Sequence, residues 1–397
     1  MSGSRKTVLL LACCQAMAMT SMGILATVAA IVGNMLAANK ALSTVPVALQ
    51  QTGMMCATIP AALLMARIGR RGGFWTGTAL GASGAVVAGC AVWGASFPLF
   101  CLGTLMIGSS NGFAQQYRFA AAELADEAFR ARAISLVLAG GVVSGLFGPE
   151  VAKWSRDLFT PVLFAGCFAM IAALQAGAAG LLSFARLPPP PPRGSVHGGR
   201  PLGQIVRQPL FMIALLCGMV GNGVMALVMT ATPIAMIGCG FVFTDAAFVI
   251  QWHILGMFAP SFVTGSLINR FGLPRVLFAG ATLLAACCAI NLSGVAEGNF
   301  WAANFLLGVG WNFLFVGGTT LLTRTYRPEE RAKVQALNDF MIFGTATVSA
   351  FSSGALLAGA GWTVVQMTVM PFIAVAAAAI LWLRWGTART EPEYAGN

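Results

Sequence analysis

The stretch LFMIALLCGMVGNGVMALVMTATPIAMI, residues 210–237, contains no charged side chain. A helix needs about 20 apolar residues to cross the hydrocarbon core of a bilayer. Because a charged group at that depth is costly, an uninterrupted apolar run longer than this predicts a transmembrane helix. The rest of the chain is therefore read as the sequence of a membrane protein.

Similar apolar runs cover most of the chain. The 397 residues are 58% hydrophobic and 9% charged, with a mean hydropathy of +0.81, whereas soluble domains carry about 25% charged residues. This composition excludes a soluble enzyme. The first run is too long for a signal-peptide core and is interpreted as a retained first helix. Twelve spans are predicted near residues 8–38, 45–66, 74–95, 97–117, 133–152, 161–183, 210–237, 246–268, 276–296, 300–322, 336–358 and 363–385.

A break separates six of these spans from the other six. Residues 184–208 contain five consecutive prolines, Pro188 to Pro192, and then a stretch rich in Gly and Arg. Consecutive prolines interrupt a helix and favour extended polyproline II. We therefore expect an all-α membrane protein with an N-terminal six-helix bundle at 1–183, a linker at 184–208 and a C-terminal six-helix bundle at 209–397.

The basic residues predict the orientation. When alternate loops are assigned to opposite sides, one side holds twenty of the 23 Lys and Arg residues and the other holds Lys40, Lys153 and Arg156. Basic loop residues remain on the cytoplasmic side of a membrane. Both termini and the linker are expected in the cytoplasm of a bacterial cell with the spans in its inner membrane. The net charge of +11 then needs no nucleic-acid partner.

The two halves of the chain repeat each other. Gly108-Ser109-Ser110-Asn111 in the fourth predicted span corresponds to Gly308-Val309-Gly310-Trp311-Asn312 in the tenth. Asp126-Glu127 with Arg130 and Arg132 corresponds to Glu329-Glu330 with Arg331 and Lys333. Parallel halves of this kind indicate two bundles related by an axis along the membrane normal.

Over its whole length the chain resembles the major facilitator superfamily, whose loop signature is G-x-x-x-D-R-x-G-R-R. The loop after the second span keeps Arg67, Gly69, Arg70 and Arg71, but has Ala62 and Ala66 at the Gly and Asp positions. The loop after the eighth span keeps Gly265, Arg270 and Gly272, with Asn269 at the Asp position. The resemblance implies a transporter whose halves rock about a substrate at mid-membrane. The missing acidic residue means that its charge-relay role is not carried over.

Two pairs of residues with helical spacing suggest a ligand site. Met225 and Met229, and likewise His253 and Met257, are four residues apart, so each pair shares one helix face. Thioether sulfur and neutral imidazole are soft donors suited to Cu(I). His253 is the one histidine within a predicted span, and ionisable groups at membrane depth indicate function. The alternative is a hydrogen-bonded histidine among packing methionines.

The two pairs together resemble the CcoA-like branch of the superfamily, bacterial copper importers that supply cbb3-type cytochrome oxidase assembly. The resemblance implies that Met225, Met229, His253 and Met257 bind copper as the transported substrate, with no cofactor, and that copper chaperones follow downstream. Cys217 and Cys239 match cysteines of that branch and are possible additional ligands. Asn222 lies within about 60° of both Met225 and Met229 on a helical wheel and is a further candidate.

Other functions remain open from the sequence. A related branch carries riboflavin, so an importer or exporter of a small organic solute such as riboflavin or a drug is the main alternative. A metal sensor that does not transport is a third, and no nucleophile–base spacing indicates an enzyme. For coupling to an ion gradient, Glu150 and Asp339 are the candidate carboxylates, because acidic groups at membrane depth can relay protons.

Overall fold

The structure is a computed structural model that describes residues 3–124, 133, 136–137, 139–185, 187, 199–327 and 330–387. Within these residues the regular structure is helical, which confirms the predicted class. The helices are α1 (Gly3–Leu36), η1 (Lys40–Leu42), α2 (Val45–Trp93), α3 (Phe97–Ala114), α4 (Tyr117–Leu124), α6 (Gly140–Ser155), α7 (Ala165–Phe184), α8 (Leu202–Val206), α9 (Pro209–Gly238), α10 (Phe243–Phe258), α11 (Ser261–Phe271), α12 (Leu273–Ser293), α13 (Glu297–Leu322) and α14 (Arg331–Thr387).

Eight described helices are long and apolar enough to cross a membrane, or nine if the bent pair α10 and α11 counts as one span. The twelve runs predicted from the sequence exceed this number partly because α2 and α14 each contain two of the predicted runs, as two helices joined at a kink. α2 is broken by a kink at Gly69, whose φ is 84° and which lies in the loop expected after the second span. α14 is broken in the same way at Gly361, whose φ is 82°. Only glycine reaches such φ values without strain.

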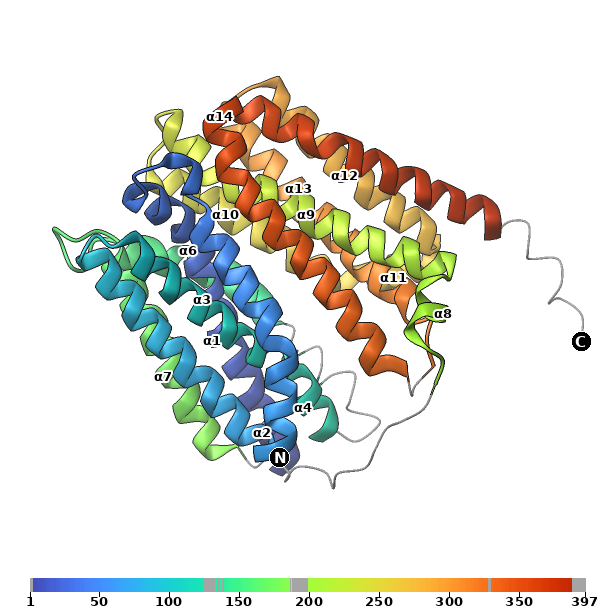
Figure 1. Cartoon of the computed structure of the whole chain (residues 1–397), viewed down its shortest axis with the longest axis horizontal. Helices are drawn as coiled ribbons and strands as arrows, with labels where there is room; N and C mark the ends of the chain where they lie inside the picture. The colour runs from blue at the N-terminus through green and yellow to red at the C-terminus, as the bar shows by residue number, and fades with distance from the viewer. Residues whose placement is uncertain are drawn as a thin grey trace, which may run out of the picture.

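The helices form two groups (Figure 1). The first group contains α1 to α7 and the second contains α9 to α14, and the two lie side by side along α6 and α10 and along α2 and α14. Each group has its own buried apolar core. Pro188 to Pro192, His197 and the acidic and basic residues at 126–132 are predicted features that lie outside the described residues, and α8 falls within the predicted linker.

Polar and aromatic contacts join the two groups at one end. The Thr44 hydroxyl, at the start of α2, donates to the Ala350 carbonyl at 2.7 Å and accepts from the Gly354 N–H at 3.0 Å, both in α14. The rings of Phe164 and Phe243 pack edge to face at 5.2 Å between centroids. The guanidinium of one arginine of the first group, Arg156, lies within 5.6 Å of both ring centres. We name this the Thr44 end.

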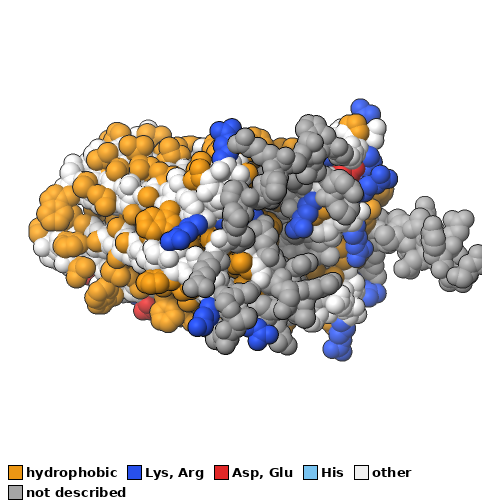
Figure 2. All heavy atoms as spheres, turned by 90° about the horizontal axis from the view of Figure 1, so that it is seen from below, with side chains coloured by type: hydrophobic (Ala, Val, Ile, Leu, Met, Phe, Trp, Pro, Cys, Tyr) orange, Lys and Arg blue, Asp and Glu red, His pale blue; other side chains and the backbone are white. Residues whose placement is uncertain are grey.

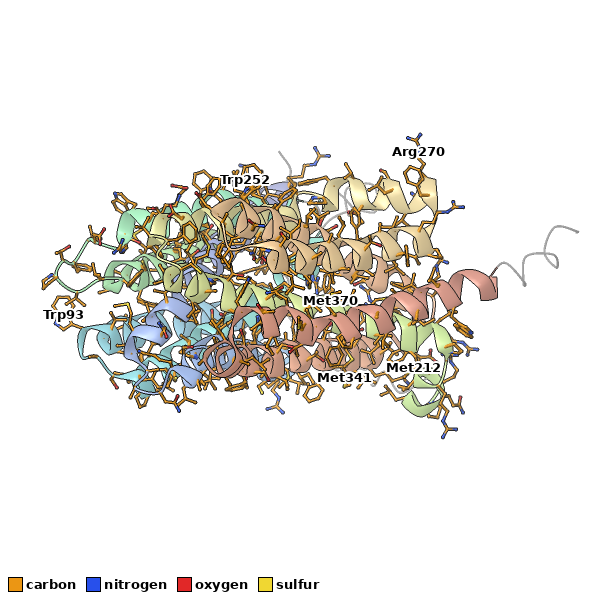
Figure 3. All side chains as sticks on the ribbon, turned by 90° about the horizontal axis from the view of Figure 1, so that it is seen from above. Trp93, Met212, Trp252, Arg270, Met341 and Met370 are labelled. Carbon is orange, nitrogen blue, oxygen red and sulfur yellow. The ribbon has the colours of Figure 1, made fainter. Side chains whose placement is uncertain are left out.

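The opposite end carries most of the basic side chains. On the face in Figure 2, most Lys and Arg side chains lie toward one end, and the other end is largely hydrophobic. Figure 3 shows Trp93 at the second of these ends and Met212 and Arg270 at the first. We name the first the basic end. There Arg200 donates to both carboxylate oxygens of the buried Glu330, at 2.9 and 2.7 Å, and so holds the chain before α8 against the start of α14.

Glycines let two helix pairs cross closely, once in each group. A Cβ at Gly53 of α2 would lie 2.3 Å from the Leu105 carbonyl oxygen of α3, and one at Gly108 would lie 2.0 Å from the Gln50 carbonyl oxygen. No side chain fits at such distances, so only glycine allows these backbones to meet. The first crossing therefore fixes the part of α2 around Gln50 against α3.

The second crossing repeats the first. A Cβ at Gly256 of α10 would lie 2.7 Å from the Phe305 carbonyl oxygen of α13, and one at Gly308 would lie 2.4 Å from the His253 carbonyl oxygen. A residue of α2 corresponds to the residue of α10 whose number is 203 higher. A residue of α3 corresponds to the residue of α13 whose number is 200 higher. The Gly108 and Gly308 repeat seen in the sequence is thus a repeated helix crossing.

Candidate functional site

A cavity of about 110 Å³ lies between the two groups. Its lining comes from α1, α2 and α6 of the first group and from α9 and α10 of the second. A space that both groups enclose changes shape whenever the groups move, which is what a carrier requires. The lining residues are Met19, Met22, Gly23, Ala26, Ala30, Val47, Gln50, Gln51, Ser144, Met225, Ala226, Met229, Thr230, Ile254, Met257 and Phe258.

Five methionines dominate this lining. Met19 and Met22 come from α1, Met225 and Met229 from α9, and Met257 from α10. Both methionines of the predicted pair in α9 therefore line one cavity. Methionine side chains are unbranched and polarizable, so they adapt their shape to a ligand and make favourable contacts with aromatic rings. The arrangement forms a deformable, largely apolar surface.

The polar part of the lining carries no charge. Gln50, Gln51, Ser144 and Thr230 contribute amides and hydroxyls, and none of the lining residues is Asp, Glu, Lys, Arg or His. The Ser144 hydroxyl donates to the Met19 carbonyl of α1, so it is already engaged. The Oε1 atom of Gln51 is buried and has no hydrogen-bond partner. Because Gln51 lines the cavity, its amide is a hydrogen-bonding group close to any ligand held there.

His253 is not part of the lining. Its side chain is buried, and Nδ1 lies 2.9 Å from the Asn304 carbonyl oxygen of α13. That contact requires Nδ1 to donate, so the imidazole joins two helices of the second group. Of the four predicted ligands the structure brings Met225, Met229 and Met257 to the cavity and holds the imidazole against α13. The described residues include no group of three or more His, Cys, Asp or Glu side chains that could hold a metal ion.

The additional candidates lie elsewhere as well. Cys217 is buried in the core of the second group, and Cys239 is exposed where α9 ends. The Asn222 amide donates to the Gly218 carbonyl at 2.9 Å and accepts from the indole N–H of Trp311 at 3.1 Å. Asn222 therefore orients Trp311 and has no part in the lining.

The two carboxylates predicted to couple transport to an ion gradient, Glu150 and Asp339, differ in their charged partners. The Glu150 carboxylate is 51% exposed and lies 2.6 Å from the Lys153 ammonium on the same helix, so it forms a surface pair. Asp339 of α14 interacts electrostatically with Arg118 of α4, which belongs to the other group, and its Oδ1 accepts from Asn338 at 3.2 Å. Of the two, only Asp339 has a charged partner across the interface between the groups.

The amides of the first group are functional candidates that the sequence analysis missed. Gln50, Gln51 and Met54 are equivalent to His253, Ile254 and Met257 under the repeated helix crossing. Of these three equivalent pairs, only Gln51 and Ile254 both line the cavity. The signal was in the sequence: aligning Gly53 with Gly256 and Gly108 with Gly308 places Gln51 opposite a residue of the eighth span.

The family follows from comparison with known proteins. The model of the Major Facilitator Superfamily matches residues 11–259 and 243–396, which together cover nearly the whole chain. The chain belongs to this superfamily. The superfamily and the relatives described below are transporters, so the protein is a multi-pass membrane transporter. Proteins of this kind are generally not enzymes.

Several relatives span most of the chain. A riboflavin transporter, RfnT of Brucella anthropi, is 40% identical over 376 residues, which are 94% of each protein. YddS of Bacillus subtilis, an uncharacterized MFS-type transporter, is 27% identical over 92% of this chain and 87% of its own.

Solved structures of other transporters have the same fold. The nucleoside transporter NupG superposes with a TM-score of 0.72 at 12% identity, covering 94% of this chain and 99% of its own. The transporter FucP superposes with a TM-score of 0.63 at 15% identity, covering 95% and 98%.

The prediction of copper import is wrong. The relative with 40% identity over nearly the full length is a riboflavin transporter, and nothing in the comparisons supports membership of the CcoA-like branch. The physical basis of the error is the spacing argument itself. A spacing of four residues places His253 and Met257 near one helix face, but a helix that packs on both sides can still direct one to a neighbouring helix and the other to a cavity.

Proposed function

We propose that this protein transports a small, uncharged organic solute with a flat ring, and that riboflavin is the first substrate to test. The cavity between the two groups carries the proposal, because its lining combines five methionines and one aromatic ring with amides and hydroxyls. The near full-length similarity to a riboflavin transporter supports the same choice. Riboflavin has a flat tricyclic ring and a polyol chain, and both parts are uncharged at neutral pH.

The absence of charge in the lining argues for an uncharged solute. An ion moved into a low-dielectric cavity loses its hydration, and this cost is several kcal/mol unless an opposite charge compensates it. None of the cavity-lining residues supplies such a charge. Hydroxyl and amide groups, by contrast, need only hydrogen-bond partners, which Gln50, Gln51 and Thr230 can provide.

The size of the cavity indicates how binding would proceed. Pockets for drug-sized ligands typically enclose about 300–1,000 Å³, and the present cavity of about 110 Å³ is smaller. Riboflavin therefore requires either movement of the two groups or new rotamers of the methionines. Both are consistent with a carrier that alternates between exposing the cavity at the Thr44 end and exposing it at the basic end.

The proposed topology has six spans in each group, with residues 1–183 and 209–397 forming the two bundles. The basic end faces the cytoplasm of a bacterium, and both termini lie there, because most Lys and Arg side chains gather at that end. The Thr44 end then faces outward. In this orientation import requires the contacts of Thr44 and Phe243 to open before the solute enters.

Uptake by a strain that cannot make riboflavin tests the proposal. Expression of the protein should restore growth at low external riboflavin and accumulation of the labelled vitamin. Met225→Trp fills the cavity and should abolish uptake at unchanged membrane abundance. Met212→Trp is the matched control, because Met212 lies on the same helix but is 52% exposed at the basic end (Figure 3). Absence of uptake by the abundant wild-type protein would refute riboflavin import.

A further inference from the structure

The cavity has one polar and one apolar residue at equivalent positions of the repeat. Gln51 of α2 and Ile254 of α10 are related by the repeated helix crossing, and both line the cavity. The buried Oε1 of Gln51 has no partner, whereas Ile254 offers only hydrocarbon. A ligand with one hydrogen-bonding edge and one apolar edge therefore has a single favourable orientation between them.

We propose that Gln51 determines specificity by pairing with the imide edge of a flat heterocycle, an N–H group flanked by carbonyls. This inference rests on the proposed function and identifies the part of the solute that is recognised. In riboflavin the imide edge is the pyrimidine end of the ring, and the opposite end is a dimethylbenzene. The ring lies with its imide toward α2 and its methyl groups toward Ile254 and Phe258 of α10.

The chemistry of the glutamine amide fits this edge. Its carbonyl oxygen accepts one hydrogen bond and its NH₂ group donates two, in one plane. An imide presents a donor beside an acceptor, so the two groups form a planar pair of hydrogen bonds. The pair satisfies the unpartnered oxygen, and leaving that oxygen unpaired against a ligand costs about 1–3 kcal/mol, or roughly 5- to 150-fold in affinity.

The backbone around Gln51 is held in place by close contacts with α3. The carbonyl of the preceding residue, Gln50, meets α3 at Gly108, and Gly53 meets the Leu105 carbonyl of the same helix. Both contacts involve backbone atoms on either side of Gln51, which prevents α2 from turning about its axis. A side chain supported by rigid backbone contacts discriminates between ligands better than one on a mobile loop.

The experiment measures binding of riboflavin and of 3-methylriboflavin, in which a methyl group replaces the imide hydrogen. The full-length purified protein is titrated with each compound, and quenching of the flavin fluorescence gives the two dissociation constants. Gln51→Met tests the proposal, because methionine has nearly the same length and leaves the space around the methyl group unchanged. Gln15→Met is the control: Gln15 of α1 is buried with an unpartnered Oε1 but does not line the cavity.

Wild-type protein and Gln15→Met should both bind riboflavin roughly 5- to 150-fold more tightly than its methyl derivative. Gln51→Met should reduce this ratio to near 1 by weakening riboflavin alone, with an unchanged melting temperature. If Gln51→Met keeps the wild-type ratio, the role of Gln51 is refuted while riboflavin binding stands. If the wild-type protein binds neither flavin, the proposed function fails, and the imide assignment fails with it.

Discussion

The close crossing of α10 and α13 predicts that a single methyl group at Gly308 disrupts the cavity. A Cβ at this position would lie 2.4 Å from the His253 carbonyl oxygen, 2.9 Å from the Met257 nitrogen and 3.0 Å from the Gly256 carbonyl carbon. All three are backbone atoms, so no side chain can rotate away. Gly308→Ala therefore forces α10 to move by about 1 Å, since ordinary contact begins near 3.4 Å.

Two hydrogen bonds that join the same helices set the size of the effect. The Asn304 carbonyl accepts from His253 at 2.9 Å, and the Asn312 amide donates to the Met257 carbonyl at 2.7 Å. Overpacking typically costs about 1–3 kcal/mol, and each weakened hydrogen bond adds roughly 0.5–1.5 kcal/mol. The better helix propensity of alanine returns about 1 kcal/mol. The net loss in the free energy of unfolding is about 1–5 kcal/mol.

Thermal unfolding in detergent and riboflavin uptake measure the two consequences. Gly308→Ala should lower the melting temperature by about 2–10 °C and reduce uptake, because Met257 and Phe258 move with α10. Gly298→Ala is the control on the same helix, where a Cβ meets no atom within 4 Å. It should be neutral or slightly stabilising. Equal melting temperatures and equal uptake for the two variants would refute the close crossing.

Three further predictions concern the ends of the molecule and the metal. Thr44→Val removes two hydrogen bonds between the groups, so the Gly354 amide should exchange its hydrogen several-fold faster in mass spectrometry, and an unchanged rate would contradict the contact. Glu330→Gln breaks the ion pair with Arg200 and should speed tryptic cleavage after Arg200, because the chain before α8 is then held less firmly. The hydrogen bonds from Arg200 lower the pKa of Glu330. The ion pair therefore contributes fully to the stability of the fold above about pH 4.3 and weakens only in stronger acid. The melting temperature of the wild-type protein should show no loss of this contribution between pH 8 and pH 5. Removal of copper with a chelator should leave uptake unchanged, and a fall in uptake would restore a role for the metal.

The sequence predicted the helical, membrane-spanning class because that class depends on composition. Runs such as residues 210–237 exclude charge over a length that only a membrane span explains, and they need no knowledge of neighbouring helices. The glycine repeat was visible for the same reason, since Gly108 and Gly308 stand in matching positions of two similar segments. What each glycine contacts could not be read from the spacing.

The prediction of the substrate depended on the directions in which side chains point. The spacing of residues along a helix does not determine those directions. Met225 and Met229 do line one cavity, but His253 is hydrogen-bonded to a carbonyl of α13, and the polar lining includes two amides, those of Gln50 and Gln51. A period of 3.6 residues defines a face of one helix, and it does not determine which neighbour covers that face. Composition and periodicity therefore determined by themselves that the chain spans a membrane in two similar halves. Only the packing of those halves decided which polar groups enclose the cavity, because that outcome is set by backbone contacts between helices far apart in the sequence.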